Sequence, residues 1–276
     1  MIEGWLRNNG SAIVSDDLKT PTINSPENVE TIQFLQDLIY KYGYAPIPEP
    51  NVDPIQQLMD GTVAMGSFGR WPTLSYQAND FKDAYVTKVP KFSTQQTMFG
   101  IGGVAVTSEK NYEEAAKFAL WCAQDTFVKG YLSAGGIPAN KAIADEIIPT
   151  EYDPENSQLF YASLKDAVPI GAPASYAEID SIVTSALSDI FMNKADVKTT
   201  LDNAAQQMAA AMRDAVEGRA RIKAAGGIRT LDALLALEEA GCSRFGIGVG
   251  SAVSILREAW SRAGKTLPEL PEGEKG

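Results

Sequence analysis

The apolar pattern changes type near residue 212, and this change limits the folds open to the chain. From residue 176 to residue 212 apolar side chains recur at the spacing of two successive amphipathic helices. After Arg213 the pattern predicts short alternating elements: a strand over 219–225, a helix over 231–240 closed by Gly241, a strand over 244–248 and a helix from about 251 to 262. The sequence therefore predicts two α/β regions, residues 1–212 and residues 213–276, the second being a β-α-β-α unit with a polar tail.

Capping signals and periodicity predict further elements earlier in the chain. The clearest is a helix that starts at Pro26 with Ser25 as its N-cap and ends before Gly43. The others are a short helix ending near residue 60, a strand over 62–66, a buried strand over 98–107, and a helix opened by a capping box of Asn111 and Glu114.

Acidic residues outnumber basic ones, and the excess is uneven. The formal net charge is −11 at pH 7. Residues 1–212 hold 14 basic and 26 acidic residues, whereas residues 213–276 hold 10 and 9, which agrees with a boundary near residue 212. Because phosphate binding needs clustered Lys and Arg, we expect no nucleic-acid partner.

The sequence has no apolar run approaching the roughly 18 residues that a membrane span needs, so we expect no membrane insertion. Its first residues lack the basic start and apolar stretch of a signal peptide. As written, the chain is expected to stay in the cytoplasm.

The sequence contains no histidine. This excludes Ser-His-Asp and Cys-His nucleophile systems, His-ligated zinc and histidine acid-base chemistry. Cys122 and Cys242 lie within apolar patterns, which predicts two buried, inert thiols. The series Gly246-x-Gly248-x-Gly250 lacks the third glycine spacing and the acidic partner of a dinucleotide site. We expect neither a metal nor a cofactor.

Several local signatures over residues 1–212 occur in a fixed order. They are a Ser-Pro-Glu start before the helix at residue 26, the series G-x-x-A-M-x-x-x-G-x-W over 61–71, the strand Gly-Gly-Val-Ala-Val over 102–106 with its following helix, and the turn Gly-Gly-Ile-Pro over 135–138. In this order they resemble the C-terminal half of the extracellular sugar-binding proteins of ABC importers. The resemblance implies a partial periplasmic-binding-protein-like lobe, a sugar or oligosaccharide ligand, and an ABC permease as partner.

A sugar site needs an aromatic platform for the apolar face of the ring, surrounded by hydrogen-bonding groups. Trp71 stands at the position of that platform in the family; the simpler interpretation is a half-buried loop anchor. The predicted rim and backbone contacts are Arg70, Tyr76, Gly102, Gly103, Tyr176, Glu178 and Asp180. For Tyr176, a place in the helix core is an equally open alternative.

The resemblance also implies that the chain starts partway through the second of two lobes. In the family, ligand is held in the cleft between the lobes. We therefore expect sugar capture to be impaired.

Residues 219–256 resemble the seventh and eighth β-α units of deoxyribose-phosphate aldolase, at the end of a TIM barrel. The specific motif is Arg-Ile-Lys-Ala-Ala-Gly-Gly-Ile-Arg-Thr over 221–230, followed by Ala-Gly-Cys-Ser-Arg-Phe-Gly over 240–246. The resemblance implies that Lys223 is the second lysine of the aldolase site. It implies phosphate contacts at Gly226, Gly227, Gly248, Gly250 and Ser251.

Two departures count against aldolase turnover. The residues before the motif are helical, and the Schiff-base lysine motif is absent from the sequence. Where the family has a Thr-Ser-Ser run, this chain has Ile247, Gly248 and Val249.

Three hypotheses stay open at this point. The first is a non-catalytic carbohydrate-binding lobe, and the second is an aldolase-like lyase. The third is a chimera of the two fragments without selected activity. We also expect the strand over 219–225 to add to the edge of a sheet formed by residues 1–107, since two incomplete α/β fragments could share one sheet.

Overall fold

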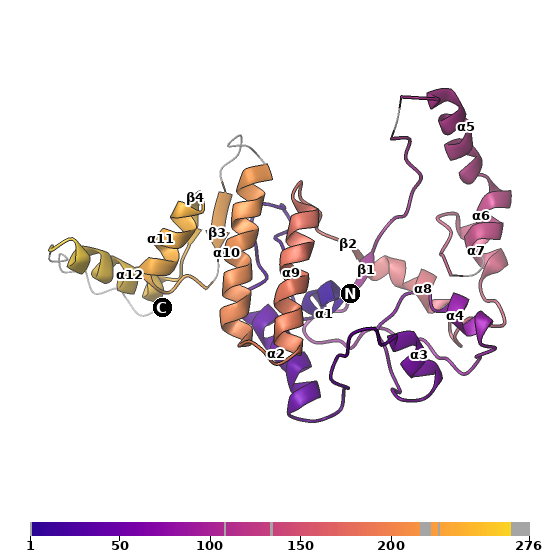
Figure 1. The fold of residues 1–276 in the computed structure, drawn as a ribbon, viewed down its shortest axis with the longest axis horizontal. Coiled ribbons are helices and arrows are strands. Elements are labelled where there is room, and N and C mark those ends of the chain that lie inside the picture. Colours follow the sequence, from indigo (N-terminus) through magenta and orange to yellow (C-terminus); the bar gives the residue numbers. More distant parts are fainter. Residues whose placement is uncertain (1, 108, 133–134, 216–221, 226, 266–276) are drawn as a thin grey trace. The chain divides into compact units, whose positions relative to one another are not determined.

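The computed structural model describes residues 2–107, 109–132, 135–215, 222–225 and 227–265 (Figure 1). The chain divides into two compact units. Unit 1 comprises residues 1–8 and 48–170, and unit 2 comprises residues 9–47 and 171–276. The predicted boundary at residue 212 does not coincide with this division, because residues 171–212 and 213–276 share unit 2.

The described residues of unit 1 are mostly helical, with one short pair of strands. Its elements are α1 (Ile2–Asn8), α3 (Pro54–Met59), α4 (Thr73–Ala78), β1 (Thr97–Phe99), α5 (Tyr112–Cys122), α6 (Asp125–Leu132), α7 (Lys141–Ile147), α8 (Leu159–Ala162), the 3₁₀ helix η1 (Ser163–Asp166) and β2 (Ala167–Pro169). Strands β1 and β2 are parallel, with Met98 opposite Val168.

Asn8 joins α1 to the chain just before β1. Its side-chain amide donates to the carbonyls of Gly4 at 2.7 Å and Gln96 at 3.0 Å, and its oxygen accepts from the Gln96 N–H at 2.9 Å. Asn8 is fully buried. A buried amide is tolerated only where its polar atoms are paired, and here the pairing holds α1 against the residue that precedes β1.

Of the two strands predicted in unit 1, one does not form and the other forms only in part. Residues 62–66 are irregular: the Thr62 N–H bonds to the Asp60 carboxylate and the Val63 N–H to the Gln57 carbonyl, so this segment folds back on α3. Of the strand predicted over 98–107, only β1 is present; residues 100–107 are irregular, and Ile101 is 82% exposed. Gly100, Gly102 and Gly103 make extended structure costly in entropy, and across residues 100–107 no strand pairs with this segment.

The predicted helix after Asn111 is present as α5, but its predicted capping box is not. Asn111 lies in the left-handed region with φ of 57° and makes no side-chain cap. The apolar face predicted for this helix is also incompletely covered, since Phe118 and Trp121 are 58% and 47% exposed while Cys122 is buried.

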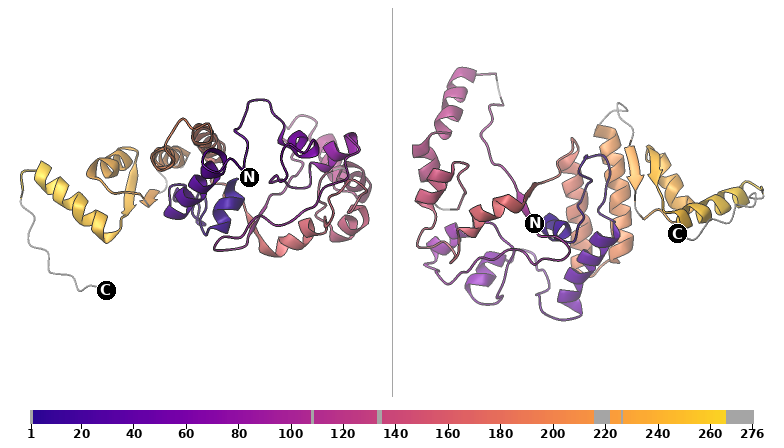
Figure 2. Two further views of the ribbon diagram at one scale, coloured as in Figure 1. Left: turned by 90° about the horizontal axis from the view of Figure 1, so that it is seen from below. Right: turned by 180° about the vertical axis from the view of Figure 1, so that it is seen from behind.

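Unit 2 contains the elements that the sequence predicts best. They are α2 (Pro26–Tyr40), α9 (Tyr176–Phe191), α10 (Val197–Ala215), β3 (Ile222–Ala225), α11 (Leu231–Glu239), β4 (Cys242–Gly246) and α12 (Val249–Arg262). Ser25 caps α2 as predicted, accepting from the Asn28 N–H. Helices α9 and α10 lie side by side (Figure 2).

The core of unit 2 lies between α2, α9 and α10. Ile32, Ile190, Leu201 and Met208 are all fully buried. The α2 side chain of Gln36 donates to the Ile190 carbonyl at 2.8 Å, which ties α2 to the end of α9. Burial of the apolar stripe supplies the main driving force for this packing.

The alternation predicted after Arg213 is confirmed, with β3 and β4 forming a parallel pair. The prediction that the strand over 219–225 adds to a sheet of residues 1–107 is wrong for the described residues of β3. Ile222 to Ala225 pair with β4 instead. Residues 219–221 and the tail after residue 265 lie outside the described residues. A β-α-β unit satisfies its inner strand edge locally, without a strand from elsewhere in the chain.

Both cysteines are free and buried, as predicted. Burial raises the pKa of the Cys242 thiol, against a smaller opposing effect of the Arg213 charge. In the described parts of the chain, no helix combines the length and the apolar character needed to cross a membrane.

Candidate functional site around Trp71

Trp71 lies in the loop between α3 and α4, directly before Pro72 at the N-cap position of α4. The carbonyl of Arg70 accepts from the Thr73 N–H at 3.0 Å, and that of Trp71 from the Leu74 N–H at 3.3 Å. These bonds make the loop end a tight turn into the helix. The indole is 48% exposed, so a large aromatic surface meets solvent here.

Gly69 lies under the indole. A Cβ atom on Gly69 would lie 2.3 Å from Cζ3 and 2.7 Å from Cε3 of Trp71, far closer than atoms pack. The six-membered ring therefore rests against the Gly69 backbone, where no side chain fits. A Cβ atom on Gly135 would lie 3.3 Å from the Trp71 Cα, so a second glycine approaches the backbone of the same residue.

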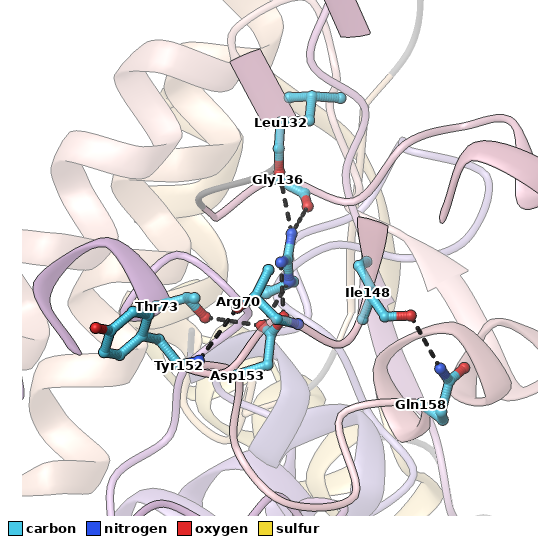
Figure 3. A network of polar contacts seen from close by, with 9 residues as sticks. Arg70, Thr73, Leu132, Gly136, Ile148, Tyr152, Asp153 and Gln158 are labelled. Atoms are coloured by element: carbon cyan, nitrogen blue, oxygen red, sulfur yellow. Dashed lines mark hydrogen bonds and ion pairs between the residues drawn. The ribbon is translucent and has the colours of Figure 1, made fainter. Parts of the chain in front are cut away.

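The side chain of Arg70 points away from solvent into a polar network (Figure 3). Its guanidinium donates Nε–H to Asp153 Oδ1 at 2.7 Å and Nη2–H to Asp153 Oδ2 at 2.8 Å, a bidentate pair in which both side chains are fully buried. Nη1 donates to the carbonyls of Leu132, at 3.0 Å, and Gly136. We call this group of contacts the Arg70 clamp.

Asp153 is held by more than Arg70. The Thr73 hydroxyl donates to Oδ1 at 3.0 Å, and the Thr150 N–H donates to Oδ2 at 2.7 Å. Burial acts to raise the pKa of Asp153, but the hydrogen bond from Arg70, the Thr150 N–H, the Arg70 charge and the Thr73 hydroxyl together hold it below its ordinary value. Asp153 is thus a carboxylate that fixes Arg70, Thr73 and Thr150 in one arrangement.

The other predicted site residues of unit 1 differ in their exposure to solvent. Arg70 is 2% exposed and Tyr76 is 3% exposed, unlike the solvent-facing donors predicted from the sequence. Tyr76 packs on Phe81 with ring centroids 5.2 Å apart, and burial raises its pKa. Gly102 and Gly103 are exposed, with open space where a side chain would be.

Tyr176, Glu178 and Asp180 belong to unit 2, in the first two turns of α9. All three are exposed, and Tyr176 is 39% exposed. Tyr176 is therefore not a core residue of α9. Ile179 fills that role, being 3% exposed.

Sequence reasoning missed Asp153, the partner of Arg70. A buried arginine requires an anion, but the chain contains 35 acidic residues, and Asp153 lies 83 positions away. No local pattern distinguishes it.

Of the aldolase-like residues, Gly226 and the side chain of Lys223 lie outside the described part. Gly227 has a φ of +68°, and a Cβ there would lie 2.6 Å from Asn24 Nδ2 and 2.8 Å from Asp202 Oδ1. It lines a cavity of about 340 Å³ between α10 and residues 227–237. Gly248 is the N-cap of α12, and Gly250 and Ser251 are in its first turn.

Across residues 2–265, outside the gaps given above, no three Cys, Asp or Glu side chains gather in a group that could hold a metal ion.

Comparison with known proteins finds similarity to substrate-binding proteins over most of the chain and similarity to an aldolase over a short segment. The chain is similar to the ABC substrate-binding protein Lmo0181 from Listeria monocytogenes in complex with cycloalternan, at 23% identity and a TM-score of 0.65, over 78% of this chain and 56% of that one. It is also similar to the maltose/maltodextrin-binding domain MalE from Bdellovibrio bacteriovorus bound to maltotriose, at 16% identity and a TM-score of 0.60, over 78% and 57%. The chain thus spans a little over half the length of these proteins.

A shorter similarity concerns the aldolase. The chain is 46% identical over 52 residues to a deoxyribose-phosphate aldolase from Sinorhizobium medicae. The matched segment is 19% of this chain and 21% of the aldolase.

The decisive match is to a family rather than to one protein. The model described as bacterial extracellular solute-binding protein matches residues 4–158, which is more than half of the chain and includes every residue of the Arg70 clamp. The α/β elements of the chain and its likeness to solved substrate-binding proteins agree with that match. The chain belongs to the bacterial extracellular solute-binding protein family.

Proposed function

We propose that this chain is a non-catalytic carbohydrate-binding protein of an ABC importer, with Trp71 as the stacking platform. The observation that carries the proposal is the indole of Trp71, 48% exposed and supported from below by Gly69. The two similar structures described above contain cycloalternan and maltotriose, which supports an oligosaccharide as the ligand. An ABC permease follows as the partner of such a protein.

The physical basis is the shape of a sugar ring. A pyranose has one apolar face, which packs on an aromatic ring, and a rim of hydroxyl groups, which need donors and acceptors. The open backbone at Gly102 and Gly103, in the same unit as Trp71, stays a proposed contact. Tyr176, Glu178 and Asp180 belong to unit 2, and a contact of these side chains with sugar stays a prediction from the sequence resemblance. Arg70 and Tyr76 are buried, so we leave them out of the proposed contact set.

The family is extracellular by its description.

The first prediction concerns binding. Isothermal titration calorimetry of the full chain against maltose, maltotriose and cycloalternan is expected to give binding with at least one sugar. Trp71→Ala is expected to weaken that binding by about 30-fold, because a stacked aromatic at the centre of a site contributes about 2 kcal/mol or more.

A matched control is available in unit 1. Trp121 is also a half-exposed indole, at 47%, but lies on α5 beside Phe118 and Phe127. Trp121→Ala should leave the dissociation constant unchanged. Absence of heat with every sugar, or equal losses from the two alanine variants, would contradict the proposed role of Trp71.

An aldolase function is the second candidate, supported by the 46% identity over 52 residues. We expect the chain not to cleave deoxyribose 5-phosphate, because the sequence lacks the motif of the Schiff-base lysine. A coupled assay for glyceraldehyde 3-phosphate measures the reaction. Product formation that Lys223→Met abolishes would instead support this candidate and a functional fusion.

A further inference from the structure

We propose that the Arg70 clamp is a positioning device that sets the orientation of the Trp71 indole before any sugar binds. The inference rests on the proposed role of Trp71 as the platform. It assigns to Arg70 and Asp153 a function that acts through their neighbour, without contact with the ligand.

The Arg70 clamp is linked to Trp71 through the chain itself. Arg70 is bonded to Trp71 in the chain, and its guanidinium is tied on one side to Asp153 and on the other to the carbonyls of Leu132 and Gly136 (Figure 3). Gly135, between Leu132 and Gly136 in the chain, lies close to the Trp71 backbone, since a Cβ atom added to Gly135 would lie 3.3 Å from the Trp71 Cα. The clamp therefore fixes the Trp71 backbone against the chain at residues 135–136.

The contact between Arg70 and Asp153 has a defined geometry. Nε and Nη2 form the parallel, two-point contact with a carboxylate, which allows one relative orientation of the two planes. The Thr73 hydroxyl and the Thr150 N–H bond to the same carboxylate and prevent it from turning. Thr73 is the first residue of α4, so the clamp holds the loop on both sides of Trp71.

The indole of Trp71 also contacts the chain at Gly69. With the backbone of Trp71 fixed, the absence of a side chain at Gly69 lets the indole rest against the chain in one place. Trp71 as a whole is 48% exposed, so part of its surface meets solvent. A platform held in this way binds a rigid ring with less loss of side-chain freedom than a mobile one.

Stability alone is a weak reason for such a group. Desolvation of two buried charges offsets much of their attraction, and apolar residues of similar volume often stabilise a protein as well. What a buried two-point ion pair supplies better than an apolar contact is a defined direction. Because Arg70 is bonded to Trp71 in the chain, fixing the orientation of Arg70 also restricts the backbone orientation of Trp71.

The test follows the indole itself. The full chain is labelled with 5-fluorotryptophan, and its four tryptophans, at positions 5, 71, 121 and 260, give four ¹⁹F resonances. Trp71→Phe assigns the resonance of interest. Arg70→Lys and Asp153→Asn are expected to shift and broaden the Trp71 resonance, to leave the other three in place, and to weaken sugar binding by about tenfold.

Two glycine positions provide a matched pair of variants that tests the contact between Gly69 and the Trp71 indole. Gly69→Ala adds a methyl group that meets the indole, whereas Gly66→Ala adds one that meets the ring of Phe68 at 2.1 Å. The Trp71 resonance should move in Gly69→Ala and stay in Gly66→Ala. The reverse pattern would contradict the inference.

Two outcomes would overturn the role of the clamp. One is an unchanged Trp71 resonance in both Arg70→Lys and Asp153→Asn. The other is a joint collapse of the Trp5, Trp71 and Trp121 resonances in both variants, which would make the pair a general support of unit 1. The resonances are recorded without sugar, so failure of the wild-type chain to bind sugar would end the proposed function while the positioning result stands separately.

Discussion

Asp153→Ala is expected to lower the free energy of unfolding of unit 1 by about 3–5 kcal/mol. The substitution would leave the Arg70 guanidinium buried without its carboxylate, and an unpaired buried charge costs this much. It would also remove the acceptor for the Thr73 hydroxyl and the Thr150 N–H. Because the chain has two units, hydrogen exchange read peptide by peptide is the suitable measurement, and protection should fall at Thr150 and in α4.

An exposed ion pair in the same region provides the control. Lys82 lies 3.1 Å from Glu151, with both side chains about half exposed or more. Lys82→Gln should change stability by less than about 1 kcal/mol, since exposed pairs contribute little. Equal effects of the two substitutions would contradict the importance of burial at Asp153.

Acid should loosen unit 1 in the same place. Asp153 has a lower pKa in the folded chain than its ordinary value, so its contribution to stability is present above that value and is lost as the pH falls through the folded pKa. We expect the protection factor of the Thr150 N–H, which compares its observed exchange rate with the intrinsic rate at the same pH, to fall below about pH 4. Asp153→Asn should show a smaller change with pH, and an identical acid response in the two proteins would contradict this assignment.

Leu201→Ala is expected to destabilise unit 2 by about 2–5 kcal/mol. Leu201 is fully buried on α10, where that helix packs on α2 and α9, and truncation removes apolar contact and leaves a cavity. Chemical denaturation followed by hydrogen exchange in α9 and α10 measures the loss.

Gln207 is the control on the same helix, because its side chain is exposed. Gln207→Ala should change stability by no more than about 0.5 kcal/mol. If Leu201→Ala were equally mild, the core of unit 2 would not lie where α2, α9 and α10 meet.

The helices of unit 2 could be predicted because their signals are local. Ser25 and Pro26 set the start of α2, and apolar side chains at helical spacing define α9 and α10. The strand and helix alternation from β3 to α12 was predicted for the same reason: each element carries its own period and its own glycine or threonine boundary.

The strands of unit 1 could not be predicted in this way. Residues 62–66 and 100–107 have the composition of strands, but a strand needs a partner to bond its N–H and C=O groups, and composition does not say whether one is present. Among the described residues 97–107, only Thr97 to Phe99 pair with another strand, which is β2, about 70 residues further along.

At the site, the sequence by itself determined that an aromatic residue follows Gly69 and Arg70, in an order that resembles sugar-binding proteins. Tertiary structure decided which of these residues faces solvent. Arg70 turns inward because a carboxylate 83 residues away is placed to receive it, and Trp71 turns outward over Gly69. Spacing along the chain fixes the order of side chains, whereas their burial depends on which distant groups pack against them.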